Sequence, residues 1–236
     1  MHIFYTPDIL ENPCLPEEES AHCVRVLRMS VGQEVLLADG RGTFYRARIA
    51  DNHPKHCSVE ILEALPQAPK STRIRVAVAP TKNLDRMEWL VEKLTEMDVD
   101  GIYFLNCRFS ERRVLKTDRL LRIAVSAMKQ SERATLPEIG ELADFGSFVE
   151  AAAARHPGSC FICHCYKDLG ERPLLRDLCQ PGADNLVLIG PEGDFSPEEV
   201  QLAVAKGFRA VSLGDMRLRT ETAALVSALT VQLQSV

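Results

Sequence analysis

Two stretches near the C-terminus combine glycines, charged side chains and short apolar runs in an order that predicts ligand chemistry. In the first, residues 186–199, an apolar run ending at Ile189 leads into the turn Gly190-Pro191-Glu192-Gly193, and Ser196 with Glu199 forms a capping box that begins a helix. Sites in open α/β sheets lie beyond the carboxyl ends of the strands. We expect a ligand-binding edge here, with a plain turn as the alternative.

The first stretch is strongly acidic, and this restricts its ligand. Glu192, Asp194, Glu198 and Glu199 crowd the turn. The N-terminus of a helix often binds phosphate, but these carboxylates would repel an anion. The turn therefore favours a cationic ligand over a phosphate.

The second stretch, residues 210–224, has the same order of an apolar run, a glycine-bearing loop and the start of a helix. An apolar run meets Gly214, the irregular loop Asp215-Met216-Arg217-Leu218-Arg219 follows, and a helix begins at Thr220 or two residues later with Glu221 in its first turn. Helix capping explains the threonine and the glutamate but not the two arginines before them. Two such edges near the C-terminus predict a pocket built from two loops.

Signatures of several other chemistries are missing. The sequence has no G-x-G-x-x-G, G-x-x-x-x-G-K-[ST], H-E-x-x-H or G-x-S-x-G motif, which argues against dinucleotide binding, P-loop hydrolysis, zincin proteolysis and α/β-hydrolase chemistry. The stretch Cys160-Phe161-Ile162-Cys163-His164-Cys165 offers soft metal ligands, but its alternation with Phe and Ile is typical of a buried strand. We expect core cysteines and no metal.

The elements that must position these loops are short apolar runs alternating with helical periodicity. Strands are expected at residues 74–79, 102–105, 160–165, 186–189 and 210–213, and helices at 84–97, 120–128 and 223–233. Fully apolar short strands separated by helices indicate a parallel sheet covered on both faces. The sequence therefore predicts an α/β fold for this part of the chain.

The first third of the chain is β-rich. Residues 34–38 and 43–49 flank a glycine-bearing turn and predict two strands, and residues 57–64 predict a third. A polar, proline-punctuated stretch follows and marks the best boundary. We expect a small β domain over residues 1–68 and a larger α/β domain over residues 72–236.

The composition is that of a globular protein. The chain has 236 residues, of which 46% are hydrophobic and 26% charged, with a formal net charge of −5. This balance argues against a strongly cationic nucleic-acid-binding protein. No apolar run reaches the roughly 18 residues of a membrane span, the start lacks a signal peptide, and 8 cysteines are few for a secreted disulfide framework. We expect a cytoplasmic protein with reduced thiols and no membrane partner.

The net charge averages two basic islands with an acidic remainder. Residues 22–48 carry +3 and residues 105–133 carry +5, which leaves −13 for the rest. The ordinary explanation of such islands is a solvated surface. The functional explanation is that their arginines and lysines contact phosphate groups, with Phe44 and Tyr45 available for base stacking. If the islands bind RNA, the expected contacts are Arg25, Arg28, Arg46, Arg48, Arg112, Arg113 and Arg133.

Six stretches, in this order, resemble the bacterial small-subunit rRNA uridine-N3 methyltransferases (RsmE type) of the SPOUT superfamily. They are VRVLRM at 24–29, KNLDRME at 82–88, KLTEM at 93–97, QSER with LPEI at 130–139, IGPEG at 189–193 and LRTETA at 218–223. The resemblance implies a PUA-like β-barrel RNA-binding domain followed by an α/β SPOUT domain tied in a trefoil knot. It also implies a homodimer that uses S-adenosyl-L-methionine to methylate 16S rRNA or the small ribosomal subunit.

The resemblance also implies a cofactor pocket. Its residues would be Ile189, Gly190, Pro191, Glu192, Gly193, Leu213, Gly214, Met216, Leu218 and Arg219. Asp194 departs from the family, which usually has a second glycine there, and Asp215-Met216-Arg217 replaces a loop with proline and arginine. An acidic turn suits a cofactor with a sulfonium cation.

Methylation of uracil N3 requires loss of a proton and alignment of the nitrogen with the methyl group, so positioning supplies much of the rate. We expect Arg219 to orient the base or to stabilise negative charge on its oxygens, and Glu221 or Glu192 to assist as a carboxylate. The target uridine must be exposed, because N3 lies on the Watson–Crick edge. The alternatives are a SPOUT ribose-2′-O methyltransferase and a non-catalytic ribosome-assembly protein.

Overall fold

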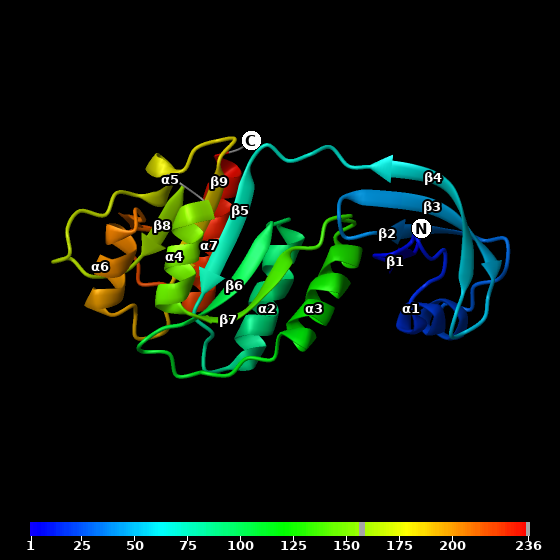
Figure 1. The fold of residues 1–236 in the computed structure, drawn as a ribbon, viewed down its shortest axis with the longest axis horizontal. Helices are drawn as coiled ribbons and strands as arrows, with labels where there is room; N and C mark the ends of the chain where they lie inside the picture. The colour runs from blue at the N-terminus through cyan, green and yellow to red at the C-terminus, as the bar shows by residue number, and fades with distance from the viewer. Residues whose placement is uncertain (156–158, 235–236) are drawn as a thin grey trace. The chain divides into compact units, whose positions relative to one another are not determined.

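The computed structural model describes residues 1–155 and 159–234. By its internal contacts the chain forms two compact units (Figure 1). The first comprises Met1–Pro69 and Val125–Leu136, and the second comprises Lys70–Ala124 and Pro137–Val236. The sequence assigned all residues after 72 to the α/β domain, so the membership of Val125–Leu136 in the first unit was not expected. The domain limits 1–68 and 72–236 stay a prediction.

The first unit contains a four-stranded mixed sheet. Its strands are β1 (Ile3–Tyr5), β2 (Glu34–Ala38), β3 (Thr43–Asp51) and β4 (Ser58–Pro66), in the order β1-β2-β3-β4. The β1–β2 pair is parallel and the other pairs are antiparallel. Three of these strands were predicted, whereas β1 is too short to show a pattern. In the turn between β2 and β3, the Asp39 carboxylate accepts the N–H groups of Arg41 and Thr43 at 2.7 and 3.0 Å.

One helical segment of the first unit covers this sheet. It consists of α1 (Glu17–Ala21) and a π-helical turn, η1 (His22–Val26), and the sequence analysis did not predict it. Glu19 of α1 is buried, and its Oε1 accepts hydrogen bonds from Lys129 Nζ at 2.6 Å and from the Tyr5 N–H at 3.3 Å. A buried carboxylate needs such partners, so this contact fixes α1 to the end of α3.

The second unit contains a six-stranded sheet in which every pair is parallel, as predicted. Its strands are β5 (Arg73–Val78), β6 (Gly101–Asn106), β7 (Glu138–Asp144), β8 (Cys160–Cys163), β9 (Asp184–Ile189) and β10 (Arg209–Val211). The order is β10-β8-β9-β5-β6-β7. The sequence missed β7, which lies at the sheet edge and lacks an apolar run. The expected α/β domain with a parallel sheet is confirmed, and the knot stays a prediction.

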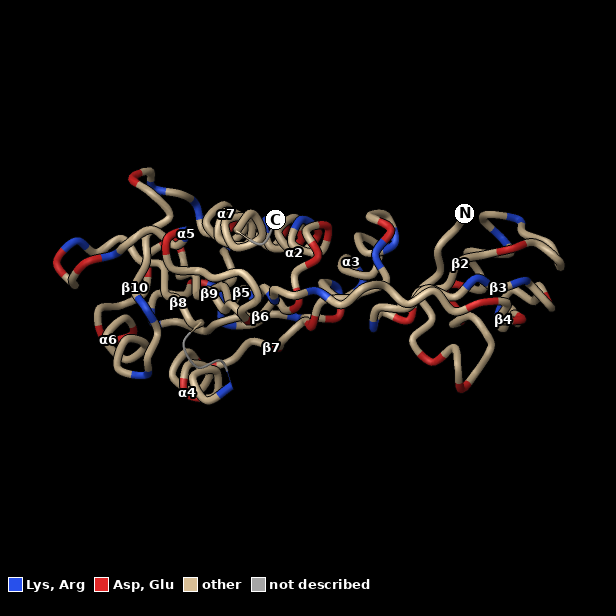
Figure 2. The backbone as a smooth tube through the Cα atoms, turned by 90° about the horizontal axis from the view of Figure 1, so that it is seen from above, with Lys and Arg blue, Asp and Glu red and all other residues tan. Residues whose placement is uncertain are grey.

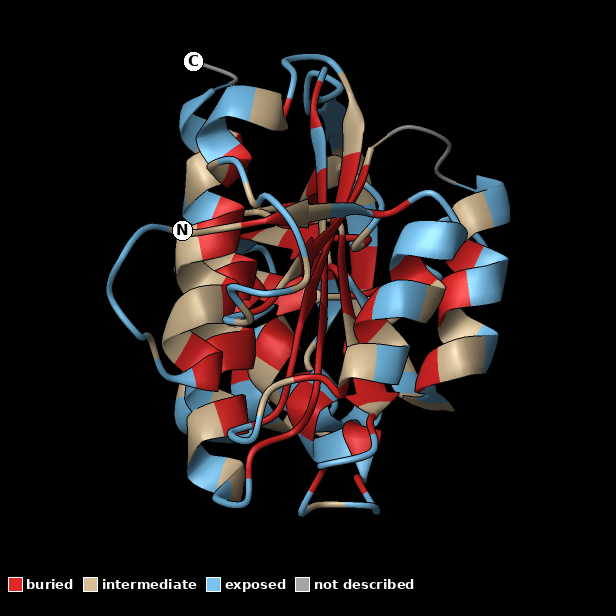
Figure 3. Cartoon of the chain, turned by 90° about the vertical axis from the view of Figure 1, so that its left-hand side faces the viewer, coloured by how far each residue is buried: buried red, intermediate tan, exposed pale blue. Residues whose placement is uncertain are grey.

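Helices cover both faces of this sheet. They are α2 (Leu84–Glu96), α3 (Thr117–Gln130), α4 (Phe145–Arg155), α5 (Leu175–Leu178), α6 (Pro197–Ala205) and α7 (Thr220–Leu233). α2 and α7 lie on one face, and α4 and α6 lie on the other (Figure 2). The strands β5, β6, β8 and β9 between them are mostly buried (Figure 3), whereas the edge strand β7 has no buried residue. Phe145, Val149, Val200 and Ala203 bring α4 and α6 into one apolar core with β8 and β9.

The strand order brings the carboxyl ends of β8, β9 and β10 to one stretch of the sheet edge, because β8 lies between the other two. Cys160 is a core residue of β8, as predicted, and burial raises the pKa of its thiol to about 11. All eight cysteines are free. Over residues 1–155 and 159–234, no three His, Cys, Asp or Glu side chains gather as ligands of a metal ion. No helix in those ranges has the length and apolarity to span a membrane.

Two glycines make room for a tyrosine at the edge of the sheet. The ring of Tyr103 on β6 lies over Gly140 on β7, and its hydroxyl donates to Glu138 Oε2 at 2.7 Å. Burial raises the pKa of Tyr103 to about 12. A Cβ atom added at Gly140 would lie 2.6 Å from Tyr103 Cδ1, and one added at Gly101 would lie 2.9 Å from the same ring. The β6–β7 pairing therefore depends on the missing side chains.

We predict that Gly140→Ala lowers the free energy of unfolding by about 1–3 kcal/mol, because the tyrosine ring must move. Thermal unfolding measures the loss. Gly146→Ala in the first turn of α4 is the matched control, since its Cβ would come no closer than 3.4 Å to Asp144 Oδ1. Equal losses in both variants would contradict the role given to Tyr103.

Candidate functional site

The turn after β9 is held by backbone contacts that exclude side chains. A Cβ atom at Gly190 would lie 2.9 Å from the Phe195 nitrogen, so only glycine fits without movement. The Gly190 carbonyl accepts a hydrogen bond from Thr220 Oγ1 at 3.2 Å. Thr220 is the first residue of α7 and is buried. The two loops predicted from the sequence are thus joined directly.

The predicted capping box is present and does more than cap α6. The Glu199 N–H donates to Ser196 Oγ at 3.2 Å, and Glu199 Oε2 accepts from the Ser196 N–H at 2.7 Å. The other carboxylate oxygen, Oε1, accepts from the Arg108 N–H at 2.8 Å. Glu199 therefore also anchors the loop that follows β6.

Asp194 has a backbone conformation that favours glycine. Its φ is 69°, in the left-handed region that favours glycine and that aspartate tolerates better than most residues. Its Oδ1 accepts from the Phe195 N–H and its Oδ2 from the Cys165 N–H, both at 2.8 Å. The aspartate thus keeps the shape of a glycine turn and ties this turn to the segment after β8.

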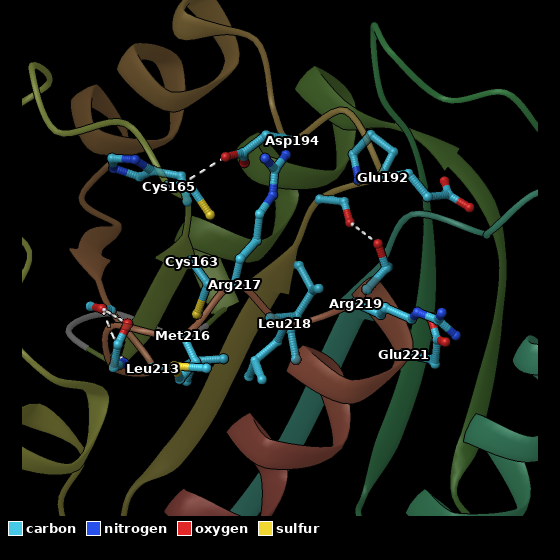
Figure 4. A pocket seen from close by; sticks show the side chains of 18 of the residues that line it. Cys163, Cys165, Glu192, Asp194, Leu213, Met216, Arg217, Leu218, Arg219 and Glu221 are labelled. Carbon is cyan, nitrogen blue, oxygen red and sulfur yellow. Dashed lines mark hydrogen bonds between the residues drawn. The ribbon is translucent and has the colours of Figure 1, made fainter.

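A cavity of about 430 Å³ opens at the carboxyl ends of β8, β9 and β10 (Figure 4). It contains the expected cofactor residues Ile189, Gly190, Pro191, Glu192, Leu213, Gly214, Met216, Leu218 and Arg219. Gly193 is the exception and lines an adjoining cavity with Asp215 and Lys167. The structure therefore brings together almost all of the residues that the sequence placed in one pocket.

Several lining residues were not among the expected cofactor residues. They are Arg86 from α2, Cys163 at the end of β8, His164, Cys165 and Arg172 from the segment after β8, Asp194 from the turn after β9, Val211 from β10, Ser212 and Arg217 from the loop after β10, and Thr220 and Ala223 from α7. We had assigned the whole stretch 160–165 to a core strand, but β8 ends at Cys163. The strand is only four residues long, so its end already belongs to the pocket edge.

The three candidates for chemistry differ sharply in their surroundings. Glu221 is only 7% exposed, its Oε1 lies 3.6 Å from Arg86 Nε, and its Oε2 has no hydrogen-bond partner among the described residues. Glu192 is exposed, and its Oε1 accepts from the Lys82 N–H at 3.1 Å. Arg219 is exposed at the start of α7. Figure 4 shows all three on the same side of the pocket.

The thiols and the imidazole of the opposite side are not activated. Burial raises the pKa of Cys163, and burial with the nearby Asp194 carboxylate raises the pKa of Cys165. His164 is buried, and burial with the Arg172 charge lowers its pKa, so the ring is neutral at pH 7. Cysteine thiolates are the reactive form, so these cysteines are poor nucleophiles.

The predicted RNA contacts are divided between the two units. In the first unit, Arg46 pairs with Glu34 at 3.4 Å and Glu63 at 3.0 Å, and Arg48 lies 3.8 Å from Glu60. These are cross-strand pairs of a solvated surface. Arg25, Arg28 and Arg133 belong to the same unit. Tyr45 is only 6% exposed and lies in the core, so the expectation that it stacks on a base was wrong.

Two further predicted contacts, Arg112 and Arg113, belong to the second unit. Arg112 donates from Nε to the Thr81 carbonyl at 3.1 Å and from Nη2 to the Lys82 carbonyl at 2.6 Å. Arg113 Nη2 donates to the Arg108 carbonyl at 3.2 Å. These hydrogen bonds order the loop after β6. Contact with RNA stays a prediction for all seven arginines.

Comparison with known proteins gives the family. A family model of an RNA methyltransferase domain matches residues 68–232, and one of an RNA methyltransferase PUA domain matches residues 15–62. The chain is 32% identical over 211 residues to ribosomal RNA small subunit methyltransferase E of Synechocystis, covering 86% of this chain and 67% of the relative. The chain belongs to this family of ribosomal RNA methyltransferases.

Solved structures agree with the assignment to the methyltransferase E family. A probable rRNA-methyltransferase from Porphyromonas gingivalis superimposes with a TM-score of 0.90 at 42% identity, covering 100% of this chain and 98% of that one. A ribosomal RNA small subunit methyltransferase E from Neisseria gonorrhoeae, bound to S-adenosyl methionine, superimposes with a TM-score of 0.84 at 26% identity, with coverage of 100% and 98%.

We predict that Asp194→Gly speeds hydrogen exchange at the Cys165 amide by about tenfold or more, because a charge-assisted hydrogen bond is lost. Asp194→Asn is the matched control, since asparagine also tolerates a positive φ and keeps one acceptor oxygen. Amide exchange followed by mass spectrometry measures both. Unchanged exchange in the glycine variant would show that Asp194 does not hold the segment after β8.

Proposed function

We propose that this chain transfers a methyl group from S-adenosyl-L-methionine to N3 of a uridine in 16S rRNA. The observation that carries the proposal is the cavity at the carboxyl ends of β8, β9 and β10, which is built from the loops that match the methyltransferase family and contains the buried Glu221. The family membership supplies the reaction class, and the site supplies residues with suitable chemistry.

The cavity fits the cofactor in size and in chemistry. About 430 Å³ lies within the usual range of small-molecule sites. Ile189, Leu213 and Leu218 offer apolar contact to an adenosine, and glycine backbone at 190 and 214 permits close approach. The Glu192 carboxylate, which also lines the cavity, suits a ligand with a sulfonium cation. When bound, this cofactor supplies an electrophilic methyl group.

Glu221 is the better of the two candidate carboxylates. Its Oε2 is buried and has no hydrogen-bond partner in the described part of the chain, so it keeps the capacity to accept the N3 proton of the uracil. Glu192 Oε1 already accepts the Lys82 N–H, and the side chain is exposed to water, which weakens its electrostatic effect. We assign proton acceptance to Glu221.

Arg219 is suited to the other half of the reaction. Loss of the N3 proton leaves negative charge on the two oxygens beside that nitrogen. Arg219 lines the cavity immediately before Thr220, whose hydroxyl fixes the start of α7 against Gly190. A guanidinium held at this place orients the base through its oxygens and stabilises the charge that develops there.

The RNA must present the uridine without a base-pairing partner, because N3 donates the Watson–Crick hydrogen bond. A paired uridine has to leave its stack before its edge can enter the cavity. The first unit, whose sequence matches a PUA domain, and the seven predicted arginines are the groups proposed to hold the surrounding rRNA or assembled small subunit.

A homodimer in the cytoplasm is the remaining part of the proposal. Trp89 on α2 and Leu229 and Leu233 on α7 are large apolar side chains that are 42%, 43% and 63% exposed. The two helices contact each other, so these side chains belong to one helical layer, which supports burial against a second copy of the chain. Sedimentation of the purified protein tests this, and a monomer at micromolar concentration would contradict it.

Nucleoside mass spectrometry of rRNA from a deletion strain tests the function. We predict that 3-methyluridine is absent from its 16S rRNA and returns after treatment with purified protein and S-adenosyl-L-methionine. Restoration of a ribose-methylated nucleoside instead would favour the 2′-O methyltransferase. An unchanged profile combined with binding to the small subunit would favour the non-catalytic assembly protein.

We predict that Glu221→Gln lowers kcat by about 100-fold or more, because the amide cannot take up the proton that a general base removes. Glu192→Gln, which also removes one negative charge from the pocket, should lower kcat by less than about tenfold. Single-turnover methylation of an RNA fragment measures both. The assignment to Glu221 is wrong if the two losses are equal or reversed.

A further inference from the structure

We infer that Arg86 is a positioning residue, which holds the Glu221 carboxylate in the orientation that faces the cavity. This inference rests on the proposed function, because it gives Glu221 a part in the reaction. Arg86 acts through Glu221 and is not assigned contact with the reacting atoms. Arg86 lies within the stretch KNLDRME that carries the family resemblance, but the sequence analysis assigned it no role, because its partner lies more than a hundred residues later in the chain.

The first observation is that the two carboxylate oxygens of Glu221 have different partners. Oε1 lies 3.6 Å from Arg86 Nε, while Oε2 is buried with no hydrogen-bond partner in the described part of the chain. Buried carboxylates are normally satisfied on both oxygens, so an unpartnered buried oxygen on a residue that lines the cavity requires an explanation. The ionic contact of Oε1 with Arg86 restricts the side chain and leaves the acceptor capacity of Oε2 unused.

The second observation is that Arg86 is itself firmly placed. It lies in the first turn of α2, where the Asn83 side chain caps the helix by accepting the Asp85 N–H at 3.0 Å. Thr81 Oγ1 donates to the Asn83 carbonyl at 2.8 Å. The side chain of Arg86 is 38% exposed and lines the cavity.

The third observation is that the segment before α2 also contacts the other carboxylate. The Lys82 N–H donates to Glu192 Oε1 at 3.1 Å. Arg112 holds this segment by donating to the carbonyls of Thr81 and Lys82. Residues 81–86 therefore form a support that contacts both Glu192 and Glu221. Of the two contacts, the one made by Arg86 involves a side chain and can be removed by substitution.

Removal of the Arg86 charge frees Glu221 to rotate, and a misplaced base costs rate without weakening cofactor binding. We expect Arg86→Gln to lower kcat by about 100-fold, which is the size of effect that an error of about 1 Å in placement produces. The dissociation constant for S-adenosyl-L-methionine, measured by calorimetry, should change by less than about threefold. Arg86→Lys restores a cation and should recover part of the loss.

Arg119→Ala is the matched control. Arg119 lies on α3 and forms an ion pair with Glu88 of α2, the helix that carries Arg86, with Arg119 Nε 2.7 Å from Glu88 Oε1. Arg119 does not line the cavity. Its removal should leave kcat within about twofold of the wild type. An equal loss in the Arg119 and Arg86 variants would overturn the inference, because it would show a general effect on α2. A parallel rise in the cofactor dissociation constant and fall in kcat would overturn it too.

A double-mutant cycle with Glu221→Gln separates this inference from the proposed function. The losses in thermal unfolding should be non-additive for Arg86→Gln and Glu221→Gln, and the double variant should be no slower than Glu221→Gln alone. Additive unfolding losses would overturn the pairing. A coupled pair in a wild-type protein that transfers no methyl group would leave the pairing intact and contradict the proposed function instead.

Discussion

The hydrogen bond from Thr220 Oγ1 to the Gly190 carbonyl is the contact on which the pocket depends. It joins the turn after β9 to the first residue of α7 at a distance of 3.2 Å, and Thr220 is only 6% exposed. Neither partner can be changed freely. Gly190 has no space for a Cβ atom, and a buried hydroxyl that lost its acceptor would be costly. With this contact in place, Ile189, Leu218 and Glu221 necessarily face a common cavity.

The carboxylates around the pocket fall into two groups. Asp194 and Glu199 accept backbone N–H groups from Cys165, Phe195, Ser196 and Arg108, so their charges serve the folding of the loops. Glu221, which the sequence placed in the first turn of a helix and which we expected to assist in the reaction, keeps a buried oxygen without a hydrogen-bond partner among the described residues. Charge density along the sequence indicated the right place, but only the hydrogen bonds separate structural carboxylates from the available one.

Patterns among neighbouring residues predicted correctly the elements that depend only on neighbouring residues. The capping box at Ser196 and the apolar runs of β5, β6 and β9 depend on neighbouring residues, and all are present. β7 was missed because an edge strand needs no apolar run, and β1 because three residues show no period. Arg86 was given no role because strand order, a long-range property, brings α2 to the pocket. His164 was missed because β8 ends one residue before it. The family resemblance supplied the cofactor, which no local pattern identifies.

The membership of Val125–Leu136 in the first unit has a consequence for modularity. A fragment that ends at residue 69 lacks Lys129, so the buried Glu19 would lose its cationic partner, and the Ala134 N–H that donates to Gln67 Oε1 at 3.0 Å would be gone. Such a fragment carries an uncompensated charge in its interior. The first unit is therefore not a transferable module, and the segments that build it can change only together, although more than fifty residues of the other unit separate them in the chain.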